Sequence, residues 1–206
     1  TTLFRSCFDG KRFKHYRDIP GSKDGLSSNS VYSLYADTKN RLWIGTLEGG
    51  LDCLDLSTGE WMYYRAGDKH NAIHTDIVYS LSGDSKGDIF VGTSSGVNWI
   101  EPETGKVSSF DGTKDGSFRF KDRIINVVFS DSRQLLWIGS NHGLHIYDPL
   151  NDRIYQLNQS TGLPDNSIMS ILEDEYHTVW VGTKNGLLNI APSRNANNEY
   201  QFNWNS

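Results

Sequence analysis

A short motif that recurs four times constrains the fold of this chain more than any other feature. The motif reads aliphatic, aromatic, aliphatic, glycine and then threonine or serine, and it occupies residues 42–46, 89–93, 136–140 and 179–183. Its glycines are 47, 47 and 43 residues apart. A repeat period of about 40–50 residues is typical of β-propeller blades and of helical repeats. The repeat therefore decides the fold, and many conspicuous residues are expected to serve it.

The residues around each motif recur in the same register. An aliphatic stretch precedes each motif, and it begins at Val31, Val78, Ile125 and Ile168. A second glycine and two further apolar stretches follow the motif, separated by turn residues. The four stretches of one unit are short, rich in Val, Ile, Tyr and Trp, and free of helical periodicity, which indicates β-strands. We therefore expect an all-β protein, a β-propeller built of four-stranded antiparallel blades.

Two further repeat positions are expected to serve the fold. An aspartate stands six positions before each aromatic residue of the motif, where it suits an Asx turn that accepts hydrogen bonds from backbone N–H groups. The aromatic residues themselves share one repeat position, so we expect the tryptophans to pack between adjacent blades rather than to stack on a sugar. These residues are Asp37, Asp84, Asp131 and Asp174, and Trp43, Trp137 and Trp180.

The units divide the chain into blades over residues 18–65, 66–111, 112–158 and 159–206. Residues 1–17 resemble the third and fourth strands of a further blade, whose first two strands have no counterpart in the sequence. The chain is therefore expected to hold about four and a half blades, an incomplete propeller fragment. Such a fragment exposes apolar blade faces, which predicts self-association through the exposed blades.

Composition excludes several classes of function. The 206 residues carry a net charge of −5 with a pI of about 5.6, so no broad basic surface is available for nucleic acid. No apolar run is long enough to span a membrane, and membrane contact is expected only through segments outside this chain. The two cysteines, Cys7 and Cys53, are too few for a disulfide scaffold and are expected to be buried free thiols.

The chain also lacks the motifs of catalytic and metal sites. It has no nucleophile elbow, no metalloprotease helix motif and no glycine-rich phosphate loop. The six histidines do not show the spacing of zinc ligands. Residues 84–88 resemble part of a calcium loop but lack its final glutamate, and they occupy a hairpin turn of the repeat. We therefore expect no catalytic residue, no metal and no cofactor.

The repeat resembles that of a known family. The first unit reads Leu26, Asn29, Val31 and Asp37, then Leu42-Trp43-Ile44-Gly45-Thr46 and Gly50-Leu51, and the fourth unit matches it between residues 163 and 187. This pattern is similar to the two-component regulator propeller repeat, over nearly the whole chain and in four copies. Asp76 and Arg123 replace the asparagine in the second and third units, and Phe90 replaces one tryptophan.

The resemblance implies a role in signal transduction. Members of that family carry seven-bladed propellers in the periplasmic sensor region of hybrid two-component histidine kinases, and their ligands are typically oligosaccharides. For this chain the resemblance implies a periplasmic segment of an inner-membrane sensor, which binds an oligosaccharide without catalysis and passes the signal to a kinase outside the chain. A dimerisation scaffold and a propeller lyase are the alternative functions.

Loops at one face of the propeller are the candidate ligand site. They vary between units while the scaffold stays fixed, as loops do when a rigid frame presents contacts. Their amide, carboxylate, guanidinium and imidazole groups suit sugar hydroxyls, and Arg123, Lys121 and Lys184 also suit a sulfate or uronate. For Asn29 and Asn166 the alternative is capping of the turn before the innermost strand. The candidates are Asn29, Glu48, Asp76, Ser95, Arg123, Asn141, His142, Asn166, Lys184 and Asn185.

Overall fold

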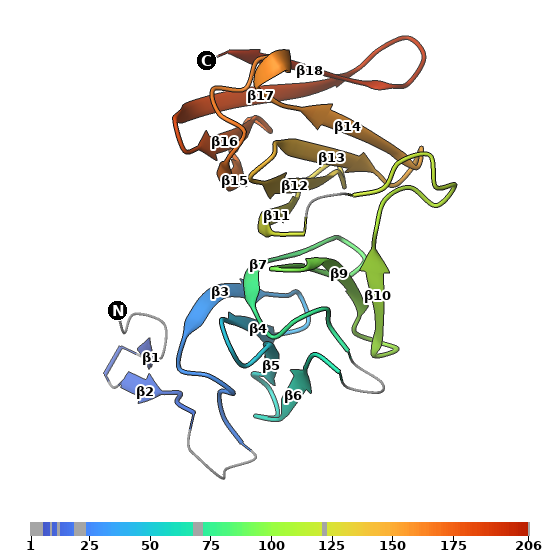
Figure 1. The fold of residues 1–206 in the computed structure, drawn as a ribbon. Coiled ribbons are helices and arrows are strands. Elements are labelled where there is room, and N and C mark those ends of the chain that lie inside the picture. Colours follow the sequence, from blue (N-terminus) through green and yellow to red (C-terminus); the bar gives the residue numbers. More distant parts are fainter. Residues whose placement is uncertain are drawn as a thin grey trace.

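A computed structural model of the protein describes residues 6–8, 10–11, 13–18, 24–67, 72–120 and 123–205. These residues form four four-stranded antiparallel sheets and one two-stranded hairpin (Figure 1), which confirms the predicted all-β propeller blades. A single turn of 3-10 helix, Gln159–Thr161, precedes the last sheet. In the described part of the chain, no helix has the length and apolarity needed to cross a membrane.

Each sheet is a meander in which consecutive strands pair. The hairpin consists of β1 (Ser6–Phe8) and β2 (Phe13–His15). The first blade consists of β3 (Val31–Ala36), β4 (Arg41–Thr46), β5 (Leu51–Asp55) and β6 (Trp61–Tyr64), and the second of β7 (Val78–Gly83), β8 (Ile89–Thr93), β9 (Gly96–Glu101) and β10 (Lys106–Phe110). The third blade consists of β11 (Ile125–Ser130), β12 (Leu136–Ser140), β13 (Leu144–Asp148) and β14 (Arg153–Leu157), and the fourth of β15 (Ile168–Glu173), β16 (Val179–Thr183), β17 (Gly186–Arg194) and β18 (Tyr200–Asn205).

The blades follow one another in chain order, and neighbouring blades meet through their innermost strands. Strand β7 lies between β3 and β11, and β11 in turn lies beside β15. Figure 1 shows this succession from the hairpin at one end to the fourth blade at the other. We call the face of a blade that looks toward the following blade its trailing face, and the opposite face its leading face.

Among the described residues, three hydrophobic clusters form the core, and each lies in the seam between two neighbouring blades. The first seam joins Trp43 and Leu51, on the trailing face of the first blade, to Val78 and Val91, on the leading face of the second. The second and third seams join the second blade to the third and the third to the fourth in the same way. The core is therefore a set of separate layers rather than one continuous centre.

The motif glycines allow the blades to approach closely in these seams. A Cβ atom at Gly45 would lie 2.6 Å from Cγ1 of Val78, and one at Gly139 would lie 2.6 Å from Cγ2 of Ile168. Both distances are shorter than carbon atoms tolerate without displacement. Any side chain at these two positions would push the neighbouring blades apart, which explains the glycine after Trp43 and after Trp137.

The predicted packing of the aromatic residues between blades holds in the first three units. Trp43 and Trp137 are fully buried, and Phe90 is nearly so. The prediction does not hold for Trp180, which is only partly buried, because no blade within the described residues lies on the trailing face of the fourth blade. The same side chain at the same repeat position is thus a core residue or a surface residue according to what lies beside its blade.

The aspartates of the repeat form the predicted Asx turns. In the first blade, Oδ1 of Asp37 accepts hydrogen bonds from the backbone N–H groups of Lys39 and Arg41, at 2.9 and 3.0 Å. The other three blades repeat this pair of bonds at Asp84, Asp131 and Asp174.

A second bond at this position was not predicted. The other carboxylate oxygen, Oδ2, accepts the indole N–H of the motif tryptophan, at 3.0 Å between Asp131 and Trp137 and at 2.7 Å between Asp174 and Trp180. The first blade has the same bond, whereas the second has Phe90, which has no donor. The hairpin turn therefore fixes the orientation of the indole in the seam.

One of the two cysteines has the predicted state. Cys53 is a buried free thiol, and burial raises its pKa to about 12. The side chain of Cys7 lies outside the described residues.

Charged residues connect the third and fourth blades at their hairpin turns. The Arg133 guanidinium lies 3.0 Å from Oε1 of Glu173, and Ser132 donates both its backbone N–H and its hydroxyl to the same carboxylate. Nδ1 of His177 lies 3.3 Å from Oε1 of Glu173. Burial raises the pKa of Glu173, but the hydrogen bonds from Ser132 and His177 and the charge of Arg133 outweigh burial and hold that pKa below its usual value.

Replacing Glu173 by glutamine is expected to lower the free energy of unfolding by about 1 kcal/mol at neutral pH, because a charged hydrogen-bond acceptor is lost. A carboxyl group whose pKa is depressed by folding stabilises the protein above its unfolded pKa, and this contribution disappears as the pH falls through the folded value. The difference between wild type and variant should therefore shrink below about pH 4. Urea denaturation on both sides of that pH measures it, and a difference independent of pH would contradict this role for Glu173.

Candidate functional site

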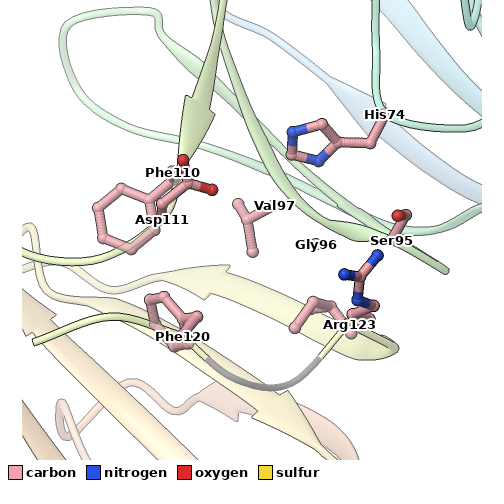
Figure 2. A pocket seen from close by; sticks show the side chains of 9 residues that line it. His74, Ser95, Gly96, Val97, Phe110, Asp111, Phe120 and Arg123 are labelled. Carbon is pink, nitrogen blue, oxygen red and sulfur yellow. The ribbon is translucent and has the colours of Figure 1, made fainter.

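A pocket of about 380 Å³ lies where the second and third blades meet. Its polar lining comes from His74 and Arg123, which precede the innermost strands β7 and β11, from Ser95 in the turn between β8 and β9, and from Asp111 after β10. Figure 2 shows these side chains around an apolar floor. The floor consists of Gly96, Val97, Phe110, Phe120 and Ile125.

The turn at the floor of the pocket is held rigidly by the last residue of the repeated motif. The hydroxyl of Thr93 donates to the carbonyl oxygen of Gly96 at 2.8 Å and accepts from the backbone N–H of Ser95 at 3.0 Å. Gly96 has a φ of 117°, a conformation that favours glycine. A Cβ atom there would lie 3.2 Å from Nδ1 of His74, so the glycine also makes room for the imidazole. The other three motifs hold their turns with the same hydroxyl-to-carbonyl bond.

One end of the pocket is a hydrogen-bonded chain of three side chains. The hydroxyl of Ser109 donates to Oδ1 of Asp111, and its oxygen lies 3.0 Å from Nε2 of His74. Because the serine proton is used on Asp111, Nε2 of His74 is the donor to Ser109, which leaves Nδ1 of a neutral imidazole as an acceptor. The backbone N–H of His74 donates to the side-chain oxygen of Asn98 at 3.0 Å, which anchors the loop to β9. This end therefore presents fixed hydrogen-bond acceptors to the pocket.

Arg123 lies at the other end of the pocket. Its repeat position has a different role in the other three blades. In the other three blades the equivalent side-chain oxygen caps a loop by accepting a backbone N–H. Asn29 accepts from Asp18 at 3.1 Å, Asp76 from Ala66 at 2.8 Å, and Asn166 from Gln159 at 2.8 Å. The capping alternative that the sequence suggested for Asn29 and Asn166 is thus present, and Asp76 caps in the same way.

Arginine has only donors and cannot replace this acceptor. Within the described residues, the Arg123 guanidinium has neither an ion pair nor a hydrogen bond, and its side chain is exposed at the pocket. Lys121, which the sequence also suggested as an anion ligand, lies outside the described residues.

The remaining candidates lie elsewhere. Ser95 and Arg123 line the pocket, whereas Glu48, Lys184 and Asn185 are exposed on the turns of the first and fourth blades. The side-chain oxygen of Asn141 accepts a hydrogen bond from Asn126 at 2.8 Å. The neighbouring His142 is exposed on the same turn of the third blade.

Seven of the nine residues that line the pocket were not candidates from the sequence, among them His74, Phe110, Asp111 and Phe120. His74 stands two positions before Asp76 in the loop that leads into β7, so its place in that loop could have identified it. Phe110 ends β10 at the repeat position of Tyr64 and Leu157, whereas Asp111 and Phe120 belong to the connection between the second and third blades, which the repeat does not cover.

A second cavity, of about 440 Å³, lies along the innermost strands. One repeat position supplies Tyr32, Tyr79, Asn126 and Met169 to its wall, and the rings of the two tyrosines meet edge to face with centroids 5.6 Å apart. The amide nitrogen of Asn126 is engaged by Asn141 and by the carbonyl of residue 168. None of the described loop candidates lines this cavity, so we place the candidate site in the pocket between the second and third blades.

The sequence of the chain matches a family model in two places. The model of the two component regulator propeller matches residues 25–48 and 162–185. In these two segments the chain is similar to the two-component regulator propeller repeat. Both matched repeats lie in the first and fourth blades, whereas the pocket is formed by the second and third, whose residues Asp76 and Arg123 depart from the repeat asparagine. No curated protein matches the chain.

Solved structures with these blades share the fold at low sequence identity. The extracellular domains of BT3049 and BT4673 from B. thetaiotaomicron, described as hybrid two-component systems, superpose with TM-scores of 0.75 and 0.71 at 21% identity. The matches cover 95% and 96% of this chain, but 26% and 27% of those chains. PorZ, a surface component of the type-IX secretion system of Porphyromonas gingivalis, has a TM-score of 0.64 at 16% identity over 78% of this chain and 26% of its own. The chain therefore spans about a quarter of these proteins.

Proposed function

We propose that this chain is an extracytoplasmic ligand-sensing propeller segment of a two-component sensor, and that it binds an oligosaccharide without catalysis. The matched propeller repeats and the fold shared with extracellular domains of hybrid two-component systems support the sensing role and the periplasmic location. The kinase that receives the signal belongs to other parts of the sensor. The observation that carries the ligand proposal is the pocket between the second and third blades.

The pocket has the chemistry that sugars need. A sugar ring presents hydroxyl groups at its edge and C–H groups on its faces, so it is held by fixed donors and acceptors around an apolar or aromatic surface. Here Asp111 and His74 offer acceptors, Ser95 and Arg123 offer donors, and Phe120 is a partly exposed aromatic ring on the floor. Hydrogen bonds of the Thr93 hydroxyl fix the turn that presents Ser95, and Asn98 anchors the loop that presents His74, which limits the entropy lost on binding.

Replacing Asp111 by alanine is expected to weaken oligosaccharide binding by about tenfold, because hydroxyl groups of the ligand lose a charged acceptor. Titration calorimetry with a panel of plant and host oligosaccharides measures the affinity. Asp115→Ala is the matched control, because Asp115 is an exposed carboxylate on the same connection, and its hydrogen bonds to described residues lie within its own turn. Silence of the folded protein across the whole panel, or equal losses in the two variants, would count against the proposed site.

The order of the Asp111, Ser109 and His74 chain supports binding rather than catalysis. In a nucleophilic triad the histidine lies between the hydroxyl and the carboxylate, so that it removes the hydroxyl proton. Here the serine lies between the other two groups and gives its proton to the carboxylate. Chromatography of each oligosaccharide before and after incubation tests this point, and the appearance of any cleavage product would overturn the non-catalytic proposal.

A second candidate function, a self-association scaffold, is favoured by the trailing face of the fourth blade. Leu187 is 56% exposed there, whereas the equivalent Leu51, Val97 and Leu144 are 0–2% exposed beneath the next blade. Leu172, on the same face, is also exposed. The face has the apolar character of half a seam, and contiguous apolar surface of this kind marks an interaction site.

We propose that a second copy of the chain covers this face. Every side chain directed to it by the strand register is uncharged, so two copies meet there without repulsion. Its outer part carries amides, which donate and accept hydrogen bonds and are therefore complementary to themselves. The residues are Ser170, Leu172, Trp180, Gly182, Leu187, Asn189, Ala191, Ser193, Gln201 and Asn203.

A further inference from the structure

We infer that the pocket between the second and third blades selects an acidic sugar, and that Arg123 binds its carboxylate or sulfate group. The inference rests on the proposed oligosaccharide function and names the class of ligand. It starts from the single unit in which the repeat position before the innermost strand carries a cation instead of a capping oxygen.

Within the described residues, Arg123 does not make the capping hydrogen bond that the other three units make at this repeat position. The acceptors at Asn29, Asp76 and Asn166 each satisfy a backbone N–H of the preceding loop, with N···O distances of 2.8–3.1 Å. Arg123 satisfies none, and within the described part of the chain its guanidinium is not used by an ion pair either. Positions at which a sequence departs from its own structural pattern are expected at functional sites. A guanidinium that lines a pocket and has no partner among the described residues is available to a ligand.

The geometry of the pocket favours one end as the binding position for the acidic group of the ligand. Figure 2 shows Arg123 and Ser95 together at one end, with Asp111 across the apolar floor at the other. A carboxylate or sulfate matches the planar fork of the guanidinium with two parallel hydrogen bonds, and the Ser95 hydroxyl is a further donor at that end. At the opposite end Asp111 would repel the acidic group and accept hydrogen bonds from sugar hydroxyls instead. The two ends therefore set the direction in which the sugar lies.

The overall charge of the chain makes this recognition local. The net charge is −5, so the long-range field of the protein does not attract an anionic glycan. Selectivity for an acidic sugar must then come from direct contact with a guanidinium. For this reason the preference is expected to depend on Arg123 and not on other exposed cations of the same loop, such as Arg119.

Paired ligands that differ only in the acidic group test the inference. The probes are oligogalacturonides against their methyl esters, and sulfated chondroitin disaccharides against their desulfated forms, which separate the carboxylate from the sulfate. By titration calorimetry, the acidic member of a pair is expected to bind about tenfold more tightly. Arg123→Gln should abolish this preference while weak binding of the neutral member persists, and Arg123→Lys should restore it in part because the charge returns without the fork.

Arg119→Gln is the matched control, since it removes the same charge four residues away outside the pocket lining. It is expected to leave the preference unchanged, and circular dichroism of each variant verifies the fold. Equal affinity for both members of every pair, or a preference that survives Arg123→Gln, would overturn the acidic ligand and leave the proposed oligosaccharide function standing. Absence of binding to every member of the pairs and of the wider panel would overturn both.

Discussion

Replacing Trp137 by alanine should lower the free energy of unfolding by about 3–5 kcal/mol, which is the usual loss for a large aromatic side chain removed from a core. The indole is fully buried in the third seam, and its N–H donates to Asp131 at 3.0 Å. Removal therefore leaves a cavity between the third and fourth blades and a buried carboxylate that has lost a donor. Since burial already raises the pKa of Asp131, the loss of that donor adds to the destabilisation.

The chain supplies its own control for this experiment. Trp180 occupies the same repeat position, and its indole N–H donates to Asp174 at the hairpin turn in the same way. It differs from Trp137 in being only partly buried. Trp180→Ala is expected to cost less than half as much, about 1–2 kcal/mol, because less apolar surface is returned to water and no closed cavity forms. Urea denaturation followed by far-ultraviolet circular dichroism compares the two. Equal losses would show that seam burial does not stabilise the propeller as described.

Replacing Leu187 by glutamate should weaken self-association of the chain by at least about tenfold. In wild type, two copies are proposed to meet through the trailing faces of their fourth blades, where Leu187 is 56% exposed in the single chain. The substitution places a negative charge from each copy in an apolar contact, and neither charge has a partner in the residues of that face.

Sedimentation velocity over a series of protein concentrations measures this association. Leu150→Glu is the matched control, because Leu150 is 74% exposed on the turn between β13 and β14 and does not belong to the face. It should leave the monomer–dimer equilibrium unchanged. A wild-type protein that stays monomeric throughout the series, or two variants with equal effects, would show that this face does not pair.

The repeat predicted the fold because each of its positions has one structural task. The aliphatic start of each unit, the aspartate and the motif glycine are needed wherever a blade turns or meets its neighbour, so four copies of the pattern indicate four blades. The bond between the aspartate and the indole could also have been predicted. A constant spacing of six residues between a carboxylate and a tryptophan in three units is a signal that the two side chains meet.

The burial of Trp180 and the role of Asp76 could not be predicted in the same way. Burial is a property of a pair of blades, and the sequence of one unit does not say what lies against it. The sequence alone does not distinguish an aspartate that caps a loop from one that binds a ligand. In the structure the backbone N–H of Ala66 lies within hydrogen-bond distance of Asp76, and this contact identifies Asp76 as a cap. Phe120 and Asp111 joined the pocket through an irregular connection, for which a repeat carries no information.

The layered core has a consequence for how such a chain tolerates change. Each hydrophobic layer touches only two adjacent blades, so a substitution in one layer directly disturbs the packing of those two blades alone. Each blade is held by hydrophobic contacts with its neighbours along the row, and these clusters contain no core that all four blades share. An individual unit can therefore carry its own surface residues while the other units keep the repeat pattern.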